Sequence, residues 1–281
     1  MKKILPGLLS LMLALAFVGC GNTETPVSEE SSSVSSEAVS SESSESVEAV
    51  VSSETEAGSE ETEETTETTG VMSFAEYEAA ELDTEVTVET YVQAKQSWWD
   101  NKATVYGQSE EGAIFMYNMV CSEEDYEKLL PGTKIRVNGF KSAWEGEVEI
   151  IDATFEILEG NFIAQATDVT ALLGTEELIA HQNEFVSFKD MTIVAKKDKD
   201  DNDAAFLYNW DGSGSEGNDL YFDAAVGDAV YSFTVESYLY GPGTDVYETV
   251  KTLNIGDVVD MEGFLYWYQG ANPHITSVTV K

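Results

Sequence analysis

The same spacing of glycines occurs twice along the chain, at an offset of 124 residues. Gly132, Gly139, Phe140, Gly146 and Ile151 in the first half match Gly256, Gly263, Phe264, Gly270 and Ile275 in the second, and Leu129 matches Leu253. Each of these glycines marks a required turn or kink in the backbone. The repeated spacing therefore predicts one folded plan that is built twice.

Residues 86–95 alternate strictly, with Val, Thr or Ala at every second position and polar or larger side chains between them. A period of two is typical of a half-buried β-strand. Further strand-like runs follow at 103–107, 113–121, 134–140 and 148–157. The segment 122–130 has a Ser cap, an acidic first turn and a closing Pro131-Gly132, which predict a short helix. Ser73 and Glu76 have capping-box spacing and predict another short helix ahead of the strands.

The second half allows the same reading. Its first strand is expected at 185–195, its second at 205–210 and another at 230–239, with a helix at 244–253. The segment 212–227 reads as an insertion that contains a turn and a short strand at 220–222.

Five strands with a helix between the third and the fourth are the plan of the oligonucleotide/oligosaccharide-binding (OB) barrel. On the segments 132–140 and 256–264, the chain resembles tandem OB-like modules of uncharacterised bacterial lipoproteins. The predicted fold is mainly β, with two five-stranded OB-like barrels at 71–160 and 161–281. The resemblance implies a fold far more than a function.

The segment 21–70 is composed of Ser, Thr and Glu with a few Val and Ala, and it has no aromatic residue. It holds 14 Glu and no Lys, Arg or Asp. Such a segment buries too little apolar surface to offset chain entropy, so we expect a disordered, extended tether.

The first 20 residues have the pattern of an export signal. Lys2 and Lys3 precede an apolar run at 4–17, which is too short for a stable membrane span, although a membrane anchor is the alternative. The run ends in Gly19-Cys20, which resembles the lipobox of bacterial lipoproteins; Phe17 departs from that pattern, where Leu is usual. The resemblance implies lipidation of Cys20. We therefore expect a membrane partner through this lipid, a place on the outer face of the cell membrane, and a Gram-positive envelope.

Cys121 is the second of two cysteines in the chain. With Cys20 acylated, Cys121 has no partner for an internal disulfide, and zinc sites built on several cysteines are excluded. Because Cys121 ends an apolar run, it is predicted to be a buried, inert thiol.

Aromatic residues gather in the loops that flank the usual ligand groove of an OB barrel. The loop after the first strand carries Trp98 and Trp99, and the turn between the fourth and fifth strands carries Trp144. Trp267 and Tyr268 lie at the equivalent turn of the second half. Such rings suit stacking on a ligand, so these five are the candidate ligand-binding residues. The alternative is that they plug a barrel end or dock the two barrels.

An oxygen-rich stretch is a weak candidate for a metal site. The spacing of Asp198, Asp200 and Asn202 resembles a calcium loop, but Asp203 and Asn209 stand where such a loop needs Gly and Glu. A solvated turn is the alternative. A second oxygen-rich stretch, from Asp211 to Asp219, departs from the pattern of a calcium loop in the same way. The sequence predicts no metal and no cofactor.

Catalytic motifs are missing from the sequence. His181 and His274 are far apart, and neither a G-x-S-x-G nor a phosphate-binding P-loop occurs. We therefore expect no catalytic residue and a protein that is not an enzyme. A hydrolase built on two carboxylates is the alternative, although acids are too frequent here for their spacing to be informative.

Charge bears on the choice of partner. The chain has 53 acidic and 14 basic residues, and both predicted barrels are strongly acidic. Affinity for phosphate backbones depends largely on Lys and Arg. The sequence thus predicts that nucleic acid is not a partner. It favours a binding or scaffold protein of the cell envelope whose ligand is a glycan, a peptide or another envelope protein, with a structural spacer as the alternative.

Overall fold

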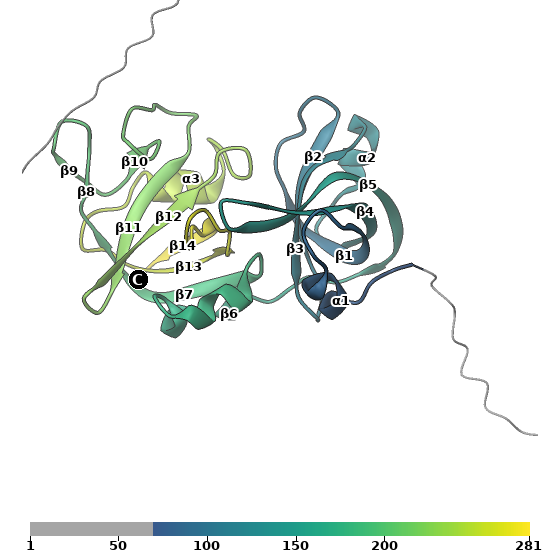
Figure 1. Cartoon of the computed structure of the whole chain (residues 1–281). Helices are drawn as coiled ribbons and strands as arrows, with labels where there is room; N and C mark the ends of the chain where they lie inside the picture. The colour runs from purple at the N-terminus through teal and green to yellow at the C-terminus, as the bar shows by residue number, and fades with distance from the viewer. Residues whose placement is uncertain (1–69) are drawn as a thin grey trace, which may run out of the picture. The chain divides into compact units, whose positions relative to one another are not determined.

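A computed structural model describes residues 70–281 of the chain (Figure 1). The expected export signal, Cys20 and the predicted tether lie outside the described residues. Within residues 70–281, no helix has the length and apolar character that a membrane crossing requires.

The first barrel consists of five strands that close on themselves in the order β1-β2-β3-β5-β4. The strands are β1 Glu85–Lys95, β2 Lys102–Gln108, β3 Ala113–Val120, β4 Thr133–Trp144 and β5 Glu147–Asn161. Buried and partly exposed side chains alternate along β1, as its sequence predicts. Helix α2, Glu123–Lys128, connects β3 to β4, and Ser122 caps its first turn.

The second barrel repeats this plan in the order β7-β11-β12-β14-β13, closed by pairing of β7 with both β11 and β13. The strands are β7 Phe185–Val194, β11 Leu220–Val226, β12 Ala229–Val235, β13 Val258–Phe264 and β14 His274–Val280. Helix α3, Asp245–Val250, lies between the third and fourth of them. In both barrels the third and fifth strands pair in parallel. The predicted fold class, two tandem OB-like barrels that each carry a short helix between strands 3 and 4, is confirmed.

Short elements surround the barrels. Helix α1, Phe74–Ala79, has the predicted capping box at Ser73 and Glu76. Two 3-10 helices, η1 Thr170–Leu172 and η2 Glu176–His181, precede β7. The remaining strands have two residues each: β6 Thr167–Asp168, β8 Lys196–Lys197, β9 Asp203–Ala204 and β10 Leu207–Tyr208.

The second strand of the second barrel is not where the sequence predicted it. The segment 205–210 contributes β10, which pairs over two residues, whereas β11 pairs with β12 over seven and also with β7. Asn209 adopts a left-handed backbone conformation with φ 60°, which ends β10 after Tyr208. The expected insertion therefore contains a barrel strand, and the aromatic run before it lies outside the barrel.

The repeated glycines allow strands 4 and 5 of each barrel to approach closely. A Cβ atom on Gly263 would lie 2.3 Å from the backbone oxygen of His274, and one on Gly139 would lie 2.8 Å from that of Ile151. Both glycines stand at register shifts between the paired strands. The glycines that repeat at an offset of 124 residues thus lie where strands 4 and 5 cross in each barrel.

The C-terminal end of α1 is held by a buried lysine. Lys141 in β4 donates hydrogen bonds from Nζ to the carbonyl oxygens of Tyr77, Glu78 and Ala80, at 2.8–2.9 Å. These carbonyls are the groups that a helix end leaves without a partner. Burial lowers the pKa of Lys141.

Cys121 directly follows β3 and is buried, as predicted. Burial raises the pKa of its thiol to about 11, so the reactive thiolate form is scarce at neutral pH.

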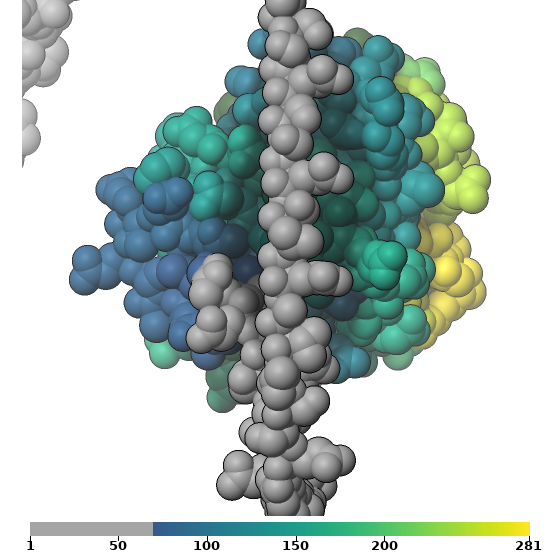
Figure 2. Space-filling model, turned by 90° about the vertical axis from the view of Figure 1, so that its right-hand side faces the viewer, coloured from purple at the N-terminus to yellow at the C-terminus, as the bar shows by residue number. Residues whose placement is uncertain are grey.

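Three hydrophobic clusters hold the described residues together. One fills each barrel, and a third, formed by Ala94, Tyr106, Phe115 and Phe264, contains residues from both. Figure 2 looks onto the first barrel, whose blue and teal atoms make up much of the coloured surface in view. The third cluster lies beside the candidate functional site.

Candidate binding cleft

Two adjoining cavities, of about 380 and 540 Å³, lie between residues of the two barrels. Gln96, Tyr117 and Glu236 line both, and we call the two cavities together the cleft. The inner cavity is completed by Phe115, Trp144, Glu149, Tyr266 and His274. The outer cavity is completed by Ser97, Trp99, Lys102, Thr104, Asn118 and Tyr238. On the first barrel this is the surface of β2 and β3 with the loops after β1 and β4, where OB barrels usually bind ligands.

Strand alternation places the aromatic side chains of β3. Ile114 and Met116 point into the first barrel, so Phe115 and Tyr117 point outward. Phe115 is covered by residues of the second barrel, whereas Tyr117 stays exposed.

Backbone contacts join the two barrels at both ends of the cleft. The backbone N–H of Ser97 donates to the carbonyl of Tyr238 at 2.7 Å. The β4–β5 turn contacts the second barrel, where the N–H of Gln269 donates to the carbonyl of Glu145, also at 2.7 Å. These bonds fix the loops that carry Trp99 and Trp144.

Stacked rings close the inner end of the cleft. The Tyr106 and Phe264 rings are stacked with centroids 4.3 Å apart, and the Tyr266 and His274 rings are stacked at 4.4 Å. The Tyr106 hydroxyl lies 2.9 Å from Nδ1 of His274 in a hydrogen bond. Burial lowers the pKa of His274 to about 3, so the imidazole is neutral and adds no positive charge to the cleft.

Two glutamates, one from each barrel, line the inner cavity. Glu149 lies in β5 and Glu236 directly follows β12, and each is only 8% exposed. Burial raises the pKa of Glu149 to about 7. Burial, with Asp219 nearby, raises the pKa of Glu236 to about 7 as well, although nearby hydrogen-bond donors act in the opposite direction.

The carboxylate of Glu236 is only partly satisfied. Its Oε1 accepts a hydrogen bond from the backbone N–H of Tyr238 at 3.1 Å. Its Oε2 is buried and makes no hydrogen bond of normal geometry among residues 70–281, although the side chain of Gln96 lies near enough to lower the pKa of the carboxyl group. An unpaired buried carboxylate oxygen is costly and therefore marks a place where a ligand can be bound.

A third carboxyl group lies behind the cleft. Glu147 is fully buried, and its Oε2 accepts a hydrogen bond from the backbone N–H of Trp267 at 2.8 Å. Burial raises its pKa to about 8, and Glu149 adds to this shift. Glu147 therefore belongs to the contact between the barrels.

The structure brings two of the five aromatic candidates into the cleft. Trp99 and Trp144 line it and are 77% and 59% exposed. Trp98 instead donates from Nε1 to the carbonyl of Cys121 at 2.9 Å, and it lines neither cavity. Trp267 packs against the core of the second barrel and on Gly146, which fits the docking alternative. Tyr268 is exposed but lines neither cavity.

Sequence reasoning missed the residues that give the cleft its chemistry, among them Tyr117, Tyr266, Glu149 and Glu236. A signal existed for Glu149, because a carboxylate within the apolar strand 148–157 is out of place on a buried face. For Glu236 we find no such signal.

The weak metal candidates form the turn between β8 and β9. Oδ1 of Asp198 accepts hydrogen bonds from the backbone N–H groups of Asp200 and Asn202, both at 2.8 Å. The carboxylate thus stabilises its own turn. No group of three or more His, Cys, Asp or Glu side chains within residues 70–281 is placed to hold a metal ion.

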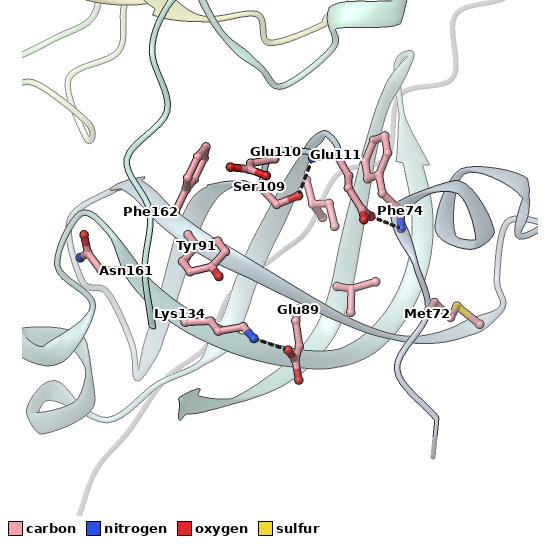
Figure 3. Close-up of a pocket in the computed structure, with 12 residues that line it drawn as sticks. Met72, Phe74, Glu89, Tyr91, Ser109, Glu110, Glu111, Lys134, Asn161 and Phe162 are labelled. Carbon is pink, nitrogen blue, oxygen red and sulfur yellow. Dashed lines mark hydrogen bonds and ion pairs between the residues drawn. The ribbon is translucent and has the colours of Figure 1, made fainter. Parts of the chain in front are cut away.

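A further cavity, of about 470 Å³, lies on the first barrel beside Tyr91 and Phe162 (Figure 3). Glu89, which lines it, pairs with Lys134 at 2.6 Å and with Arg136 at 2.7 Å. Glu110 and Glu111 also line this cavity, and Glu111 accepts a hydrogen bond from the backbone N–H of Phe74 at 3.4 Å.

The strand order and the cleft define the class of protein: a tandem OB-barrel protein with an aromatic and acidic cleft between its barrels. No protein-family model and no curated protein matches the sequence.

The chain is similar to several solved structures at low identity. One is a murine DNA-binding protein bound to double-stranded DNA, with 10% identity, 69% of this chain and 94% of that chain covered, and a TM-score of 0.32. The Ifi202 HINa domain in complex with 20-base-pair double-stranded DNA has 10% identity, coverage of 71% and 96%, and a TM-score of 0.31. A replication protein A heterotrimer bound to single-stranded DNA has 12% identity, coverage of 73% and 51%, and a TM-score of 0.29.

These similarities correct our expectation about partners. The sequence predicted that nucleic acid is not a partner, yet the similar structures are complexes with DNA. That exclusion was wrong as a conclusion from net charge alone. The DNA is the ligand of those proteins, and the fold of this chain rests on its own strand order.

Proposed function

We propose that the protein is a ligand-binding module that holds a small organic cation in the cleft. The single observation that carries the proposal is the buried carboxylate of Glu236, which lines an aromatic cavity and whose Oε2 lacks a hydrogen-bond partner among residues 70–281. A positively charged ligand would pair with this oxygen and offset the cost of burying it.

The walls of the cleft support a cation of the ammonium type. Tyr117, Trp144 and Tyr266 line the inner cavity together with the two glutamates. The face of an aromatic ring attracts a cation, by about 0.5–2 kcal/mol for each well-placed ring. Among residues 70–281, no lysine or arginine lines the inner cavity, and Lys102 lines only the outer one.

We also propose a binding role rather than a catalytic one. Hydrolysis by two carboxyl groups needs one proton donor and one ionised partner, with pKa values that differ. Burial raises the pKa of Glu149 and the pKa of Glu236 in the same direction, so neither carboxyl group is set apart as the acid or as the base.

A second candidate ligand is single-stranded nucleic acid. The observation in its favour is the row of exposed rings, Trp99, Tyr117 and Trp144, along the usual ligand surface of an OB barrel. Bases stack on such rings with little regard for sequence, and binding of this kind weakens steeply with salt.

The test is a titration of the whole protein at pH 8 in low salt, followed by tryptophan fluorescence and calorimetry. We expect choline to bind, whereas 3,3-dimethyl-1-butanol, which has the same shape without the charge, does not. Glu236→Gln should weaken choline binding at least tenfold, or about 1.4 kcal/mol. Glu159→Gln, at an exposed position of β5, serves as the matched control.

The same titration separates the candidates. Equal binding of choline and its neutral analogue, or none of either, would refute the cation proposal. Salt-sensitive binding of an oligo(dT) probe would instead favour the nucleic-acid candidate.

We further propose that lipid on Cys20 anchors the chain to the outer face of a cell membrane. Support comes from the sequence: the lysines at 2 and 3, the apolar run at 4–17, and the lipobox-like Gly19-Cys20.

A further inference from the structure

We infer that cation binding in the cleft is coupled to proton release, so that the cleft binds its ligand in mildly alkaline solution and releases it on mild acidification. This inference rests on the proposed function and describes the regulation of the same site.

The geometry places two acids in one poorly solvated cavity. Glu149 comes from the first barrel and Glu236 from the second, and both line the inner cavity beside Phe115 and Tyr266. A negative charge on either acid loses most of its hydration in such a space. Without a cation, the cavity is therefore best occupied by protonated carboxyl groups.

The other titratable groups around the cavity do not supply a compensating positive charge. Glu236 faces Asp219 and the hydroxyls of Tyr106, Tyr221 and Tyr266, and Glu149 faces Glu147 and the hydroxyls of Tyr77 and Tyr266. Burial raises the pKa of each of these tyrosines, which keeps them neutral. His274 is neutral because burial lowers its pKa.

The pKa values of the two acids place the transition near neutrality. Both are raised to about 7 by burial. Below this value the O–H bonds are intact, and an incoming cation must displace a proton. The O–H bond breaks heterolytically, the proton passes to the solvent buffer, and the carboxylate keeps the electron pair and pairs with the cation. Above about pH 8 no proton is displaced.

The test uses calorimetry of the whole protein with choline between pH 5.5 and 8.5, and the runs between pH 6 and 7.5 are made both in phosphate and in ACES, a buffer without net positive charge. The two buffers differ in ionisation enthalpy, so the difference in measured heat gives the protons released. We expect the affinity for choline to rise up to tenfold per pH unit between pH 6 and 7 and to level off above pH 8. Release should approach one proton per bound choline near pH 6.

Two variants assign the proton. Glu236→Gln, which removes the acid that pairs with the cation, should flatten the pH dependence, whereas Glu149→Gln should keep a rise of affinity with pH and Glu159→Gln should leave it as in the unmodified protein. Circular dichroism and thermal unfolding show whether each variant is folded, and Glu149→Asp, which keeps the acid, provides a second folded comparison.

The outcomes distinguish a failure of the proton coupling from a failure of the proposed cation binding. Choline binding that stays constant from pH 5.5 to 8.5, with no proton release, overturns the coupling and leaves the proposed function standing. An absence of choline binding at every pH overturns the proposed function itself.

Discussion

Glu147 shows how a single buried acid makes this protein sensitive to pH. In the folded protein the Glu147 carboxyl group keeps its proton up to about pH 8, because burial raises its pKa. In the unfolded chain the same group releases the proton near pH 4.5. Between these values the folded state binds more protons than the unfolded state. Its stability therefore falls as pH rises, by at most about 1.4 kcal/mol per pH unit for this one group.

We predict that Glu147→Gln removes this part of the pH dependence. The amide has the same shape and carries no charge, so the variant should be more stable than the unmodified protein at pH 8 and similar to it near pH 5. The measurement is urea unfolding of both proteins from pH 5 to 8.5, in which the contribution of His274, which titrates near pH 6.5 in the unfolded chain, is common to the two curves. Parallel stability curves for the two proteins would contradict the prediction.

At the scale of residues, the sequence predicted ligand contacts only where the fold itself places them. Trp99 and Trp144 were found because OB barrels bind ligands at those two loops. Glu149 and Glu236 were not found, because acids are frequent along the whole chain and burial is a property of the folded state. Trp98, Trp267 and Tyr268 show that an aromatic residue in a loop can equally well serve packing or lie outside a site.

At the scale of elements, the repeated glycines made the position of strands 4 and 5 in each barrel predictable from the sequence. Gly139 and Gly263 mark the place where strands 4 and 5 of each barrel cross, and no other residue type fits there. Where such a marker was missing, between β7 and β12, the sequence placed the second strand wrongly. The aromatic run of 205–210 has strand-like composition, but only tertiary pairing could select β11 in its place.

We predict that Gly263→Ala destabilises the protein by at least about 2 kcal/mol. The new Cβ atom would lie 2.3 Å from the backbone oxygen of His274, and backbone cannot move aside as a flexible side chain can. Urea unfolding measures the loss, and Gly139→Ala should show a similar loss in the first barrel. A loss below about 0.5 kcal/mol in both variants would show that the strand crossing tolerates a side chain.

At the scale of the whole molecule, the tandem order of the barrels was predictable and their contact was not. The contact depends on residues that look ordinary in sequence, such as Gln93. Its side chain donates to the carbonyl of Phe162 at 3.2 Å and accepts from the backbone N–H of Ala164 at 2.9 Å. Gln93 thereby holds the connection between the barrels against β1.

We predict that Cys20→Ala releases the protein from the membrane fraction into the medium or the soluble fraction. Lipid attached to a single cysteine is the proposed anchor, and each buried CH₂ group contributes about 0.8 kcal/mol to membrane binding. Fractionation after metabolic labelling with an alkyne fatty acid is the measurement, with Cys121→Ala as the control. Membrane retention of unlabelled Cys20→Ala protein would show that another segment provides the anchor.

The two acids of the cleft do not stand at equivalent places in the two barrels. Strand pairing matches Met116 with Ile150 in the first barrel and Thr234 with His274 in the second. By this correspondence Glu236 occupies the place of Asn118, and Glu149 occupies the place of Pro273. The two barrels therefore share a scaffold but not a pocket: each contributes an unlike wall of the cleft, so the proposed ligand site depends on both of them.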